Sequence, residues 1–143
     1  MRIYLDNCCY NRPFDNQNQQ RVKEETEVVF SIINSIRNGK NIILGSDTLI
    51  LEMAQIKDAK KQRDVLTLYS KTATETIEMS EKIETLADDI MSQSSIHRMD
   101  ALHLASAIIG CADIFLTVDD KLIRACEKLP LKIKVTNPTQ VGA

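Results

Sequence analysis

The sequence predicts an α/β protein whose mostly parallel sheet is covered by helices on both faces. Short apolar runs, such as "NIILGS" and "DIFLTV", alternate with longer segments whose apolar residues recur every three or four positions. The runs are nearly continuous in apolar character, as strands are when both faces of a sheet are covered. Regular alternation of strands and helices favours a parallel sheet in which the helices make the connections.

The predicted elements follow one another without a repeat or a linker, so we expect one domain over residues 1–143. Gly39 and Ser46 are placed as a helix C-cap and a helix N-cap. Strands are expected at 2–6, 41–46, 74–79, 113–118 and, at a sheet edge, 131–138. Helices are expected at 20–38, from 47 to about 54, and at 57–72, 80–94, 99–110 and about 120–129.

Composition and charge narrow the functional classes. The net charge is −2, which argues against a protein that coats nucleic acid nonspecifically, because such binding depends on surplus Lys and Arg. It does not exclude a nucleic-acid enzyme, since acids at a metal site lower the net charge. The first residues lack the apolar core of a signal peptide, and no apolar run approaches the length of a membrane span. We therefore expect a cytoplasmic protein with reduced cysteines.

Four acidic residues stand where predicted strands end or where helices begin. Asp6 ends the first strand, Asp119 follows the strand "DIFLTV", Glu52 lies early in the helix after "NIILGS", and Asp100 begins the helix "DALHLASAII". Ligands of open parallel sheets bind beyond the carboxyl ends of the strands. The sequence therefore predicts that these four carboxylates converge at one edge of the sheet.

Each acid also has a plainer interpretation. Asp6 could belong to a turn after the strand, and Asp119 or Asp120 could be a helix N-cap. Asp100 could interact favourably with the N-terminal end of its helix dipole, and Glu52 could face solvent. However, the helix that follows Asp100 is apolar on nearly every side, so a partly buried acid there needs a partner. A carboxylate-lined metal site accounts for all four positions together.

Carboxylate ligands favour a hard cation, Mg²⁺ or Mn²⁺, over zinc, which prefers thiolate and imidazole. One or two such ions can polarise a phosphodiester, lower the pKa of a bound water and stabilise the leaving oxygen. The predicted reaction is phosphodiester hydrolysis.

Four motifs resemble the PIN domain, the metal-dependent ribonuclease fold of VapC-type toxins. They are "IYLDNCCYNRPF", "LILEMA", "MDALHLASAI" and "FLTVDDKL", and the resemblance extends from Arg2 to Val135. The family's fold is a three-layer α/β/α sandwich with a parallel sheet, and its usual substrate is single-stranded or loop RNA cut with Mg²⁺ or Mn²⁺. The resemblance also implies a possible antitoxin partner and a homodimer.

By the same resemblance, Asp6, Asp100 and Asp119 bind metal, and Glu52 binds metal or orients water. The catalytic set is then Asp6, Glu52, Asp100 and Asp119. Thr117 matches the hydroxyl residue that helps to orient a ligand or water, and Asp120 is the alternative to Asp119. This chain has Asn7 after the first acid, where many members have Thr or Ser.

A site built on cysteines fits the sequence less well than the carboxylate metal site does. Cys8 and Cys9 are interpreted as packing residues in a turn beneath the metal site, and Cys111 and Cys126 as small core residues. The sequence contains no C-x-x-C motif, which argues against a zinc knuckle or a thioredoxin-like site.

The histidines do not form a site of their own. His97 and His103 lie about 9 Å apart along a helix axis, too far to share one ion comfortably. We interpret His103 as a packed residue or as one that supports the metal site from behind.

Basic residues near the predicted site are candidates for phosphate contact. Arg12, Lys57, Lys60 and Lys61 are assigned to RNA binding, although "KDAKKQR" also fits a solvated helix face. Arg98, Lys121 and Arg124 also lie near the predicted edge.

Two further interpretations are a PIN-like scaffold or nucleic-acid-binding module without activity, and a phosphotransfer domain of the haloacid-dehalogenase type. The four acids argue against the scaffold. The phosphotransfer domain typically has a second acid two positions after the first, where this chain has Cys8.

Overall fold

The computed structural model describes residues 1–141, and within them five strands form one parallel sheet. Their order across the sheet is β3-β2-β1-β4-β5, and all four neighbouring pairs are parallel. The last strand lies at an edge, as predicted. The strands are β1 (Arg2–Leu5), β2 (Ile42–Ser46), β3 (Glu75–Ile77), β4 (Ile114–Leu116) and β5 (Lys134–Thr136).

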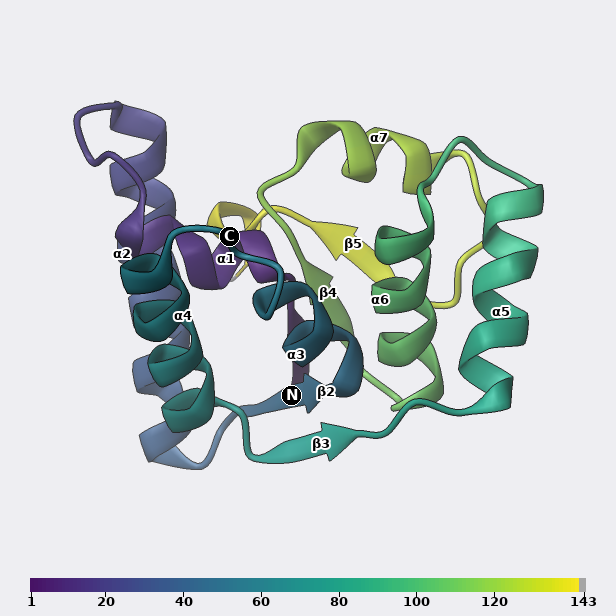
Figure 1. Cartoon of the computed structure of the whole chain (residues 1–143), viewed down its shortest axis with the longest axis horizontal. Coiled ribbons are helices and arrows are strands. Elements are labelled where there is room, and N and C mark those ends of the chain that lie inside the picture. Colours follow the sequence, from purple (N-terminus) through teal and green to yellow (C-terminus); the bar gives the residue numbers. More distant parts are fainter. Residues whose placement is uncertain (142–143) are drawn as a thin grey trace.

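Helices flank the sheet on both sides, which confirms the predicted α/β sandwich. In Figure 1, α2 and α4 lie on one side of the sheet and α5 and α6 on the other. The helices are α1 (Asn7–Asn11), α2 (Gln20–Ser35), α3 (Asp47–Met53), α4 (Ala59–Thr72), α5 (Glu81–Ser92), α6 (Arg98–Ile109) and α7 (Asp120–Glu127). Short 3₁₀ turns occupy η1 (Arg12–Phe14), η2 (Ile36–Asn38) and η3 (Pro138–Gln140).

The direction of the chain across the sheet reverses next to β1. From β1 the chain moves outward to β2 and β3, and it then returns past β1 to β4 and β5. The connections that leave β1 and β4 therefore diverge, which opens a crevice at the carboxyl ends of these two adjacent strands. Asp6 follows β1 and Asp119 lies just beyond β4, so both acids belong to this crevice.

Helix α6 lies in the centre of the core. Its residues from Ala101 to Ala107 are buried without interruption, as the apolar sequence predicts. It packs against α5 and α3. Asp100 lies in the first turn of α6, so the burial of this helix fixes the acid at the carboxyl edge of the sheet.

A close approach between β2 and α4 sets the position of α3. A Cβ atom at Gly45 would collide with the hydroxyl of Tyr69, so glycine is required there. The backbone N–H of Ser46 donates to that hydroxyl at 3.1 Å. The Ser46 side chain in turn accepts from the N–H of Leu49 at 3.0 Å, which confirms the predicted N-cap of the helix that carries Glu52.

The structure departs from the predicted elements at several places, and β3 and β4, like β5, are shorter than the predicted strands. Residues 7–14 form α1 and η1, a helical segment that the sequence analysis did not predict, and β5 is shorter than the predicted 131–138. Cys111 was expected in the core, but it is exposed and has a left-handed φ of 58° directly after the C-cap Gly110. Gly39 has the predicted left-handed C-cap conformation. No helix among the described residues has the length and apolar character needed to cross a membrane.

Candidate functional site

The four predicted acids line the same open pocket at the carboxyl edge of the sheet. The pocket has a volume of about 300 Å³. Four separate segments of the chain contribute its acids, and the loop before α2 adds a fifth. The lining residues are Asp6, Asn7, Cys8, Asn11, Asp15, Glu52, Lys61, Asp100 and Asp119.

Asp6 is buried at the base of this pocket and is held by donors on both carboxylate oxygens. Oδ1 accepts from the N–H of Asn7 at 2.8 Å, which caps α1, and Oδ2 accepts from the hydroxyl of Thr117 at 2.8 Å. Burial raises the pKa of Asp6, while His103 and the Thr117 bond lower it. The net result is a raised pKa, so the carboxylate is fixed in place but incompletely compensated.

Thr117 connects the two acids at the ends of β1 and β4. Its hydroxyl donates to Asp6 and accepts from the N–H of Asp119 at 3.2 Å. Asp119 Oδ1 accepts from the N–H groups of Lys121 and Leu122, so this residue caps α7 and also lines the pocket. The capping and pocket interpretations of Asp119 are therefore compatible.

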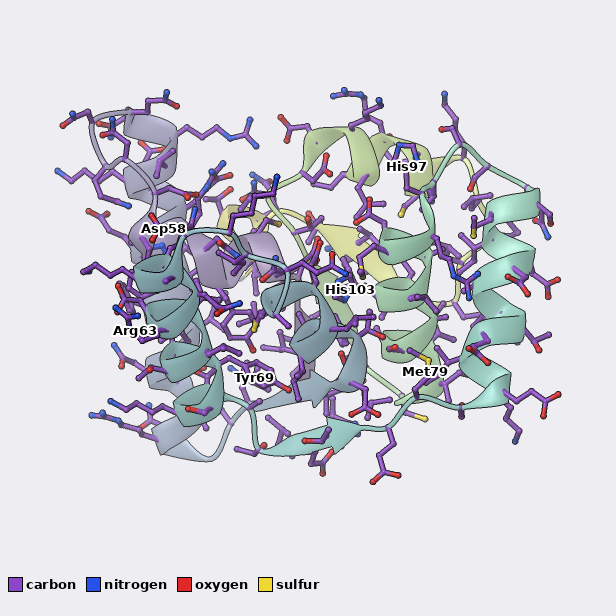
Figure 2. The ribbon with its side chains drawn as sticks, viewed as in Figure 1. Asp58, Arg63, Tyr69, Met79, His97 and His103 are labelled. Carbon is purple, nitrogen blue, oxygen red and sulfur yellow. The ribbon has the colours of Figure 1, made fainter. Side chains whose placement is uncertain are left out.

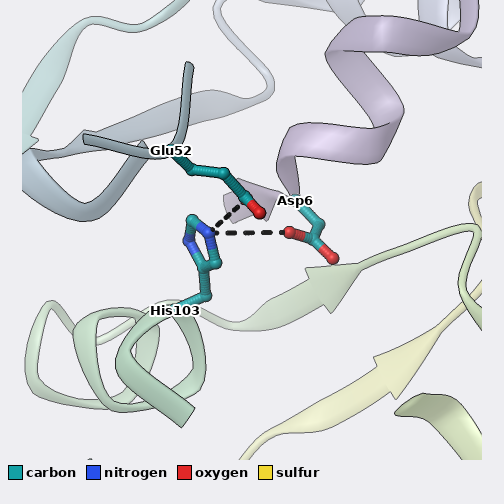
Figure 3. Close-up of side chains that lie close together, drawn as sticks. All are labelled: Asp6, Glu52 and His103. Atoms are coloured by element: carbon teal, nitrogen blue, oxygen red, sulfur yellow. Dashed lines mark hydrogen bonds and ion pairs between the residues drawn. The ribbon is translucent and has the colours of Figure 1, made fainter. Parts of the chain in front are cut away.

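His103 is fully buried, and its imidazole lies next to the carboxylates of Glu52 and Asp6 (Figure 3). Its Nε2 is 2.8 Å from Glu52 Oε1 and 3.9 Å from Asp6 Oδ1, and its Nδ1 is 2.7 Å from the hydroxyl of Tyr4. Burial lowers the pKa of His103, but the nearby carboxylates of Glu52 and Asp6 raise it more. The imidazole thus links the buried Tyr4 to the carboxylate of Glu52 and restricts the orientation of that carboxylate.

Asp6, Glu52 and His103 form a group that can hold a metal ion. One ligand atom from each lies within 4.8 Å of the others. Asp100 and Asp119 were predicted as ligands with Asp6; they line the same pocket but lie outside this tight group. The sequence analysis had placed His103 behind the site, which agrees with its burial, but it did not identify Tyr4 as the partner of the imidazole.

Asp100 is the least compensated acid of the pocket. It is half-buried, and its carboxylate accepts no hydrogen bond from residues 1–141. Burial, followed by the negative charge of Asp6, raises its pKa to about 6, with smaller contributions from Asp119 and Glu52. A cation between these carboxylates would remove the repulsion that raises this pKa.

Cys8 lines the pocket and contacts the residues that hold Asp6. Its Sγ lies 3.5 Å from Asp6 Oδ2 and 3.2 Å from the Thr117 hydroxyl, and it accepts from the N–H of Val118. The neighbouring Cys9 and burial raise the pKa of the Cys8 thiol well above its ordinary value. The thiol is therefore neutral near pH 7 and is a poor nucleophile or metal ligand. Both Cys8 and Cys9 lie within α1, not in the predicted turn.

The two supporting residues next to the acids have different surroundings. Asn7 lines the pocket, and its side-chain oxygen accepts from Asn11 at 3.0 Å. Asp120 is half exposed and forms two hydrogen bonds with the guanidinium of Arg21, at 2.6 and 2.8 Å. Asp119 rather than Asp120 lines the pocket.

Two of the predicted RNA-binding residues are engaged in ion pairs beside the pocket. Arg12 binds Glu25 at 2.9 Å and Asp15 at 3.1 Å, and the Glu25 side chain is only 2% exposed. Lys61 lines the pocket and binds Asp15 at 2.8 Å. Asp15 and Glu25 were not predicted as partners of these cations, because the segment that carries them had no predicted position relative to the acids.

The other two predicted RNA-binding residues lie at the start of α4 or just before it. Lys60 pairs with Asp64 at 3.0 Å, and Lys57 is exposed. Figure 2 shows Arg63 on the outer side of α4, so the basic stretch forms part of a solvated helix face.

Comparisons with known proteins show the fold. No family model and no curated protein sequence matches this chain. A chain in the crystal structure of VapBC2 from Rickettsia felis, bound to a DNA fragment from their promoter, matches with a TM-score of 0.61 at 18% identity, covering 96% of this chain and 98% of that one. A chain in the crystal structure of FitAcB from Neisseria gonorrhoeae matches with a TM-score of 0.59 at 18% identity, covering 97% and 99%. The chain therefore shares the complete α/β fold of these proteins.

Proposed function

We propose that this protein is a PIN-type ribonuclease that depends on a divalent metal ion. The observation that carries the proposal is the convergence of Asp6, Glu52, Asp100 and Asp119 on one open pocket. Two of these acids have raised pKa values, and Asp100 accepts no hydrogen bond within residues 1–141. Clustered carboxylates in this state fit a bound cation better than a purely structural role.

The donor set favours Mg²⁺ or Mn²⁺, held by Asp6, Asp100 and Asp119. Oxygen ligands suit these hard cations. His103 is a weaker ligand candidate, because its Nε2 already faces Glu52 at 2.8 Å and its Nδ1 faces the Tyr4 hydroxyl at 2.7 Å. We assign His103 the role of orienting Glu52.

The acids of the pocket and the residues that hold them then have defined parts in phosphodiester hydrolysis. A bound ion would lower the pKa of a water molecule and stabilise charge on the phosphate. Thr117 holds Asp6 in a fixed rotamer, and the α7 cap holds Asp119. Glu52, fixed by His103, orients the attacking water or completes the ligand set.

RNA is the proposed substrate because the sequence motifs resemble those of VapC-type toxins, and the chain has the fold of a chain in the VapBC2 structure. The same resemblance supports the toxin role in a toxin–antitoxin pair, with an antitoxin protein as partner. It also supports a homodimer. We further propose one domain per chain and a location in the cytoplasm, as the sequence predicts.

Cleavage of RNA by the purified protein tests this proposal. Wild type should cleave with Mn²⁺ or Mg²⁺ and stop on addition of a chelator, while Asp6→Asn should lose about a thousandfold in rate because a proposed metal ligand is removed. The exposed Asp89→Asn change serves as a matched control and should leave the rate unchanged. Equal cleavage by wild type and Asp6→Asn would identify a contaminating nuclease and refute the proposal.

Thr117→Val tests whether the hydroxyl positions Asp6. Valine has nearly the same shape but cannot donate to the carboxylate, so Mn²⁺ affinity should fall about tenfold. Thr117→Ser retains the donor and should restore most of the affinity. Titration calorimetry with Mn²⁺ measures both, and equal affinities in Thr117→Val and wild type would contradict the assignment.

A further inference from the structure

We propose that a single-stranded RNA runs from the acid pocket across the start of α7 into a basic groove between α7 and the α5–α6 loop. We call this surface the α7 groove, and it is lined by Gln93, Ser94, Ser95, Lys121, Arg124, Ala125, Lys128 and Leu129. The inference rests on the proposed ribonuclease function and names the path of its substrate.

The α7 groove adjoins the acid pocket through a narrow cavity between them. Asp100 and Asp119 line both the acid pocket and a narrow cavity of about 70 Å³ beside it. That cavity shares Ser95 and Lys121 with the α7 groove, which has a volume of about 340 Å³. His97, at the start of α6, lines the narrow cavity and lies beside α7 in Figure 2. A strand leaving the acids therefore meets a series of adjoining hollows that ends in the α7 groove.

The charges of the α7 groove are available to a ligand. Lys121, Arg124 and Lys128 are exposed, and none of their side chains forms an ion pair or hydrogen bond with the described residues. By contrast, Arg12 and Lys61 on the other side of the acid pocket are neutralised by acidic partners. RNA backbone recognition depends on cations that replace counterions at the phosphates. The α7 side therefore offers the stronger attraction for RNA.

The three cations share one face of α7. Positions 121, 124 and 128 are separated by three and four residues, and the seven-residue span rises about 10 Å along the axis. This length lets an extended backbone contact more than one cation. The first of them, Lys121, lies nearest the acid pocket, because it also lines the narrow cavity next to Asp119.

The remaining lining fits RNA rather than an isolated anion. The side chains of Gln93 and Ser95 form no hydrogen bond with the described residues, so they can bind phosphate oxygens, base edges or 2′-hydroxyls. Ala125 and Leu129 add an apolar surface on which a base can pack. Single strands present these groups together, whereas a stacked duplex hides its base faces.

Binding of a fluorescent random-sequence single-stranded RNA pool, measured by anisotropy in chelator over a series of salt concentrations, tests the path. The variant Lys121→Gln/Arg124→Gln/Lys128→Gln should bind about tenfold or more weakly, and its plot of log affinity against log salt should be shallower by about 2. The control Lys23→Gln/Lys71→Gln/Lys82→Gln removes three exposed lysines from α2, α4 and α5 and should bind like wild type.

Further outcomes separate this inference from the proposed function. Loss of binding in the α7 variant, with binding retained by the three-lysine control, supports the path. Equal binding by wild type and the α7 variant would overturn the path but leave the ribonuclease proposal standing. Tighter binding of duplex DNA than of the RNA pool, or no binding by wild type, would also overturn the path. If the α7 variant binds RNA more weakly but wild type cleaves no RNA, the proposed binding surface stands and the ribonuclease proposal is refuted.

Discussion

Asp100→Asn is expected to stabilise the metal-free protein while it removes RNA cleavage. The carboxylate of Asp100 is half-buried, faces the charges of Asp6 and Asp119, and has a pKa raised from 3.8 to about 6. Near pH 7 it is ionised at an energetic cost of about 1 kcal/mol, since water around the half-buried group screens most of the penalty that the raised pKa implies. Asparagine removes this cost, so the melting temperature in chelator should rise by about 3 °C.

The pH dependence of this effect has a definite sign. Between pH 3.8 and about 6 the folded protein holds a proton on Asp100 that the unfolded chain releases. The destabilisation is therefore absent below this range, grows as the pH rises through it, and is complete above about pH 6. The stability difference between Asp100→Asn and wild type should follow the same course. A difference that stays constant from pH 4 to 7 would contradict the raised pKa.

Added Mn²⁺ should reverse the order of stability. A bound cation stabilises the folded wild type by mass action, whereas Asp100→Asn lacks a proposed ligand and should gain less. Cleavage by the variant should fall about a thousandfold, because the transition state loses part of its charge stabilisation. Asp89→Asn again provides the control, since this exposed acid lies on α5, outside the acid pocket.

The second large effect is expected at Glu25, whose role is structural. Its side chain is 2% exposed and accepts from Arg12, Arg21 and Asn137 at 2.9, 3.2 and 2.6 Å. Glu25→Ala leaves two guanidinium groups without their shared buried partner, so the free energy of unfolding should fall by about 3 kcal/mol. Chemical denaturation measures this loss.

The neighbouring Glu27→Ala is the matched control, because Glu27 lies exposed on the same helix and should change stability by less than about 0.5 kcal/mol. Cleavage per folded Glu25→Ala molecule should stay near wild type, since Glu25 does not line the acid pocket. A loss of cleavage without a loss of stability would show instead that Glu25 and the arginines it binds act on the substrate.

The placement of the acids could be predicted from sequence because strand ends are encoded locally. Asp6 and Asp119 directly follow apolar runs, and parallel strands bring their carboxyl ends to one edge. Asp100 was predictable because seven buried residues of α6 follow it, so its charge needs a partner at the carboxyl edge of the sheet. The position of Glu52 could be predicted from the N-cap at Ser46, because this N-cap sets where α3 begins.

The partners of the acids depend on pairings between distant segments, which the sequence pattern does not encode. The Tyr4 hydroxyl reaches His103 only because β1 lies beneath α6, and their positions are 99 residues apart. Likewise, Arg12 looked available for RNA because the distance of α2 from η1 was unknown, and in the structure Glu25 binds it. The short helix α1 escaped prediction because five residues are too few to show a helical period.

The most direct test of the central claim is the anomalous diffraction of crystals soaked in Mn²⁺. We predict an anomalous peak in the acid pocket, coordinated by oxygens of Asp6, Asp100 and Asp119 and close to Glu52. Crystals of Asp100→Asn should show a weaker peak or none. A pocket without manganese at saturating concentration, or an ion bound only elsewhere on the protein, would contradict a metal-dependent site built from these four acids.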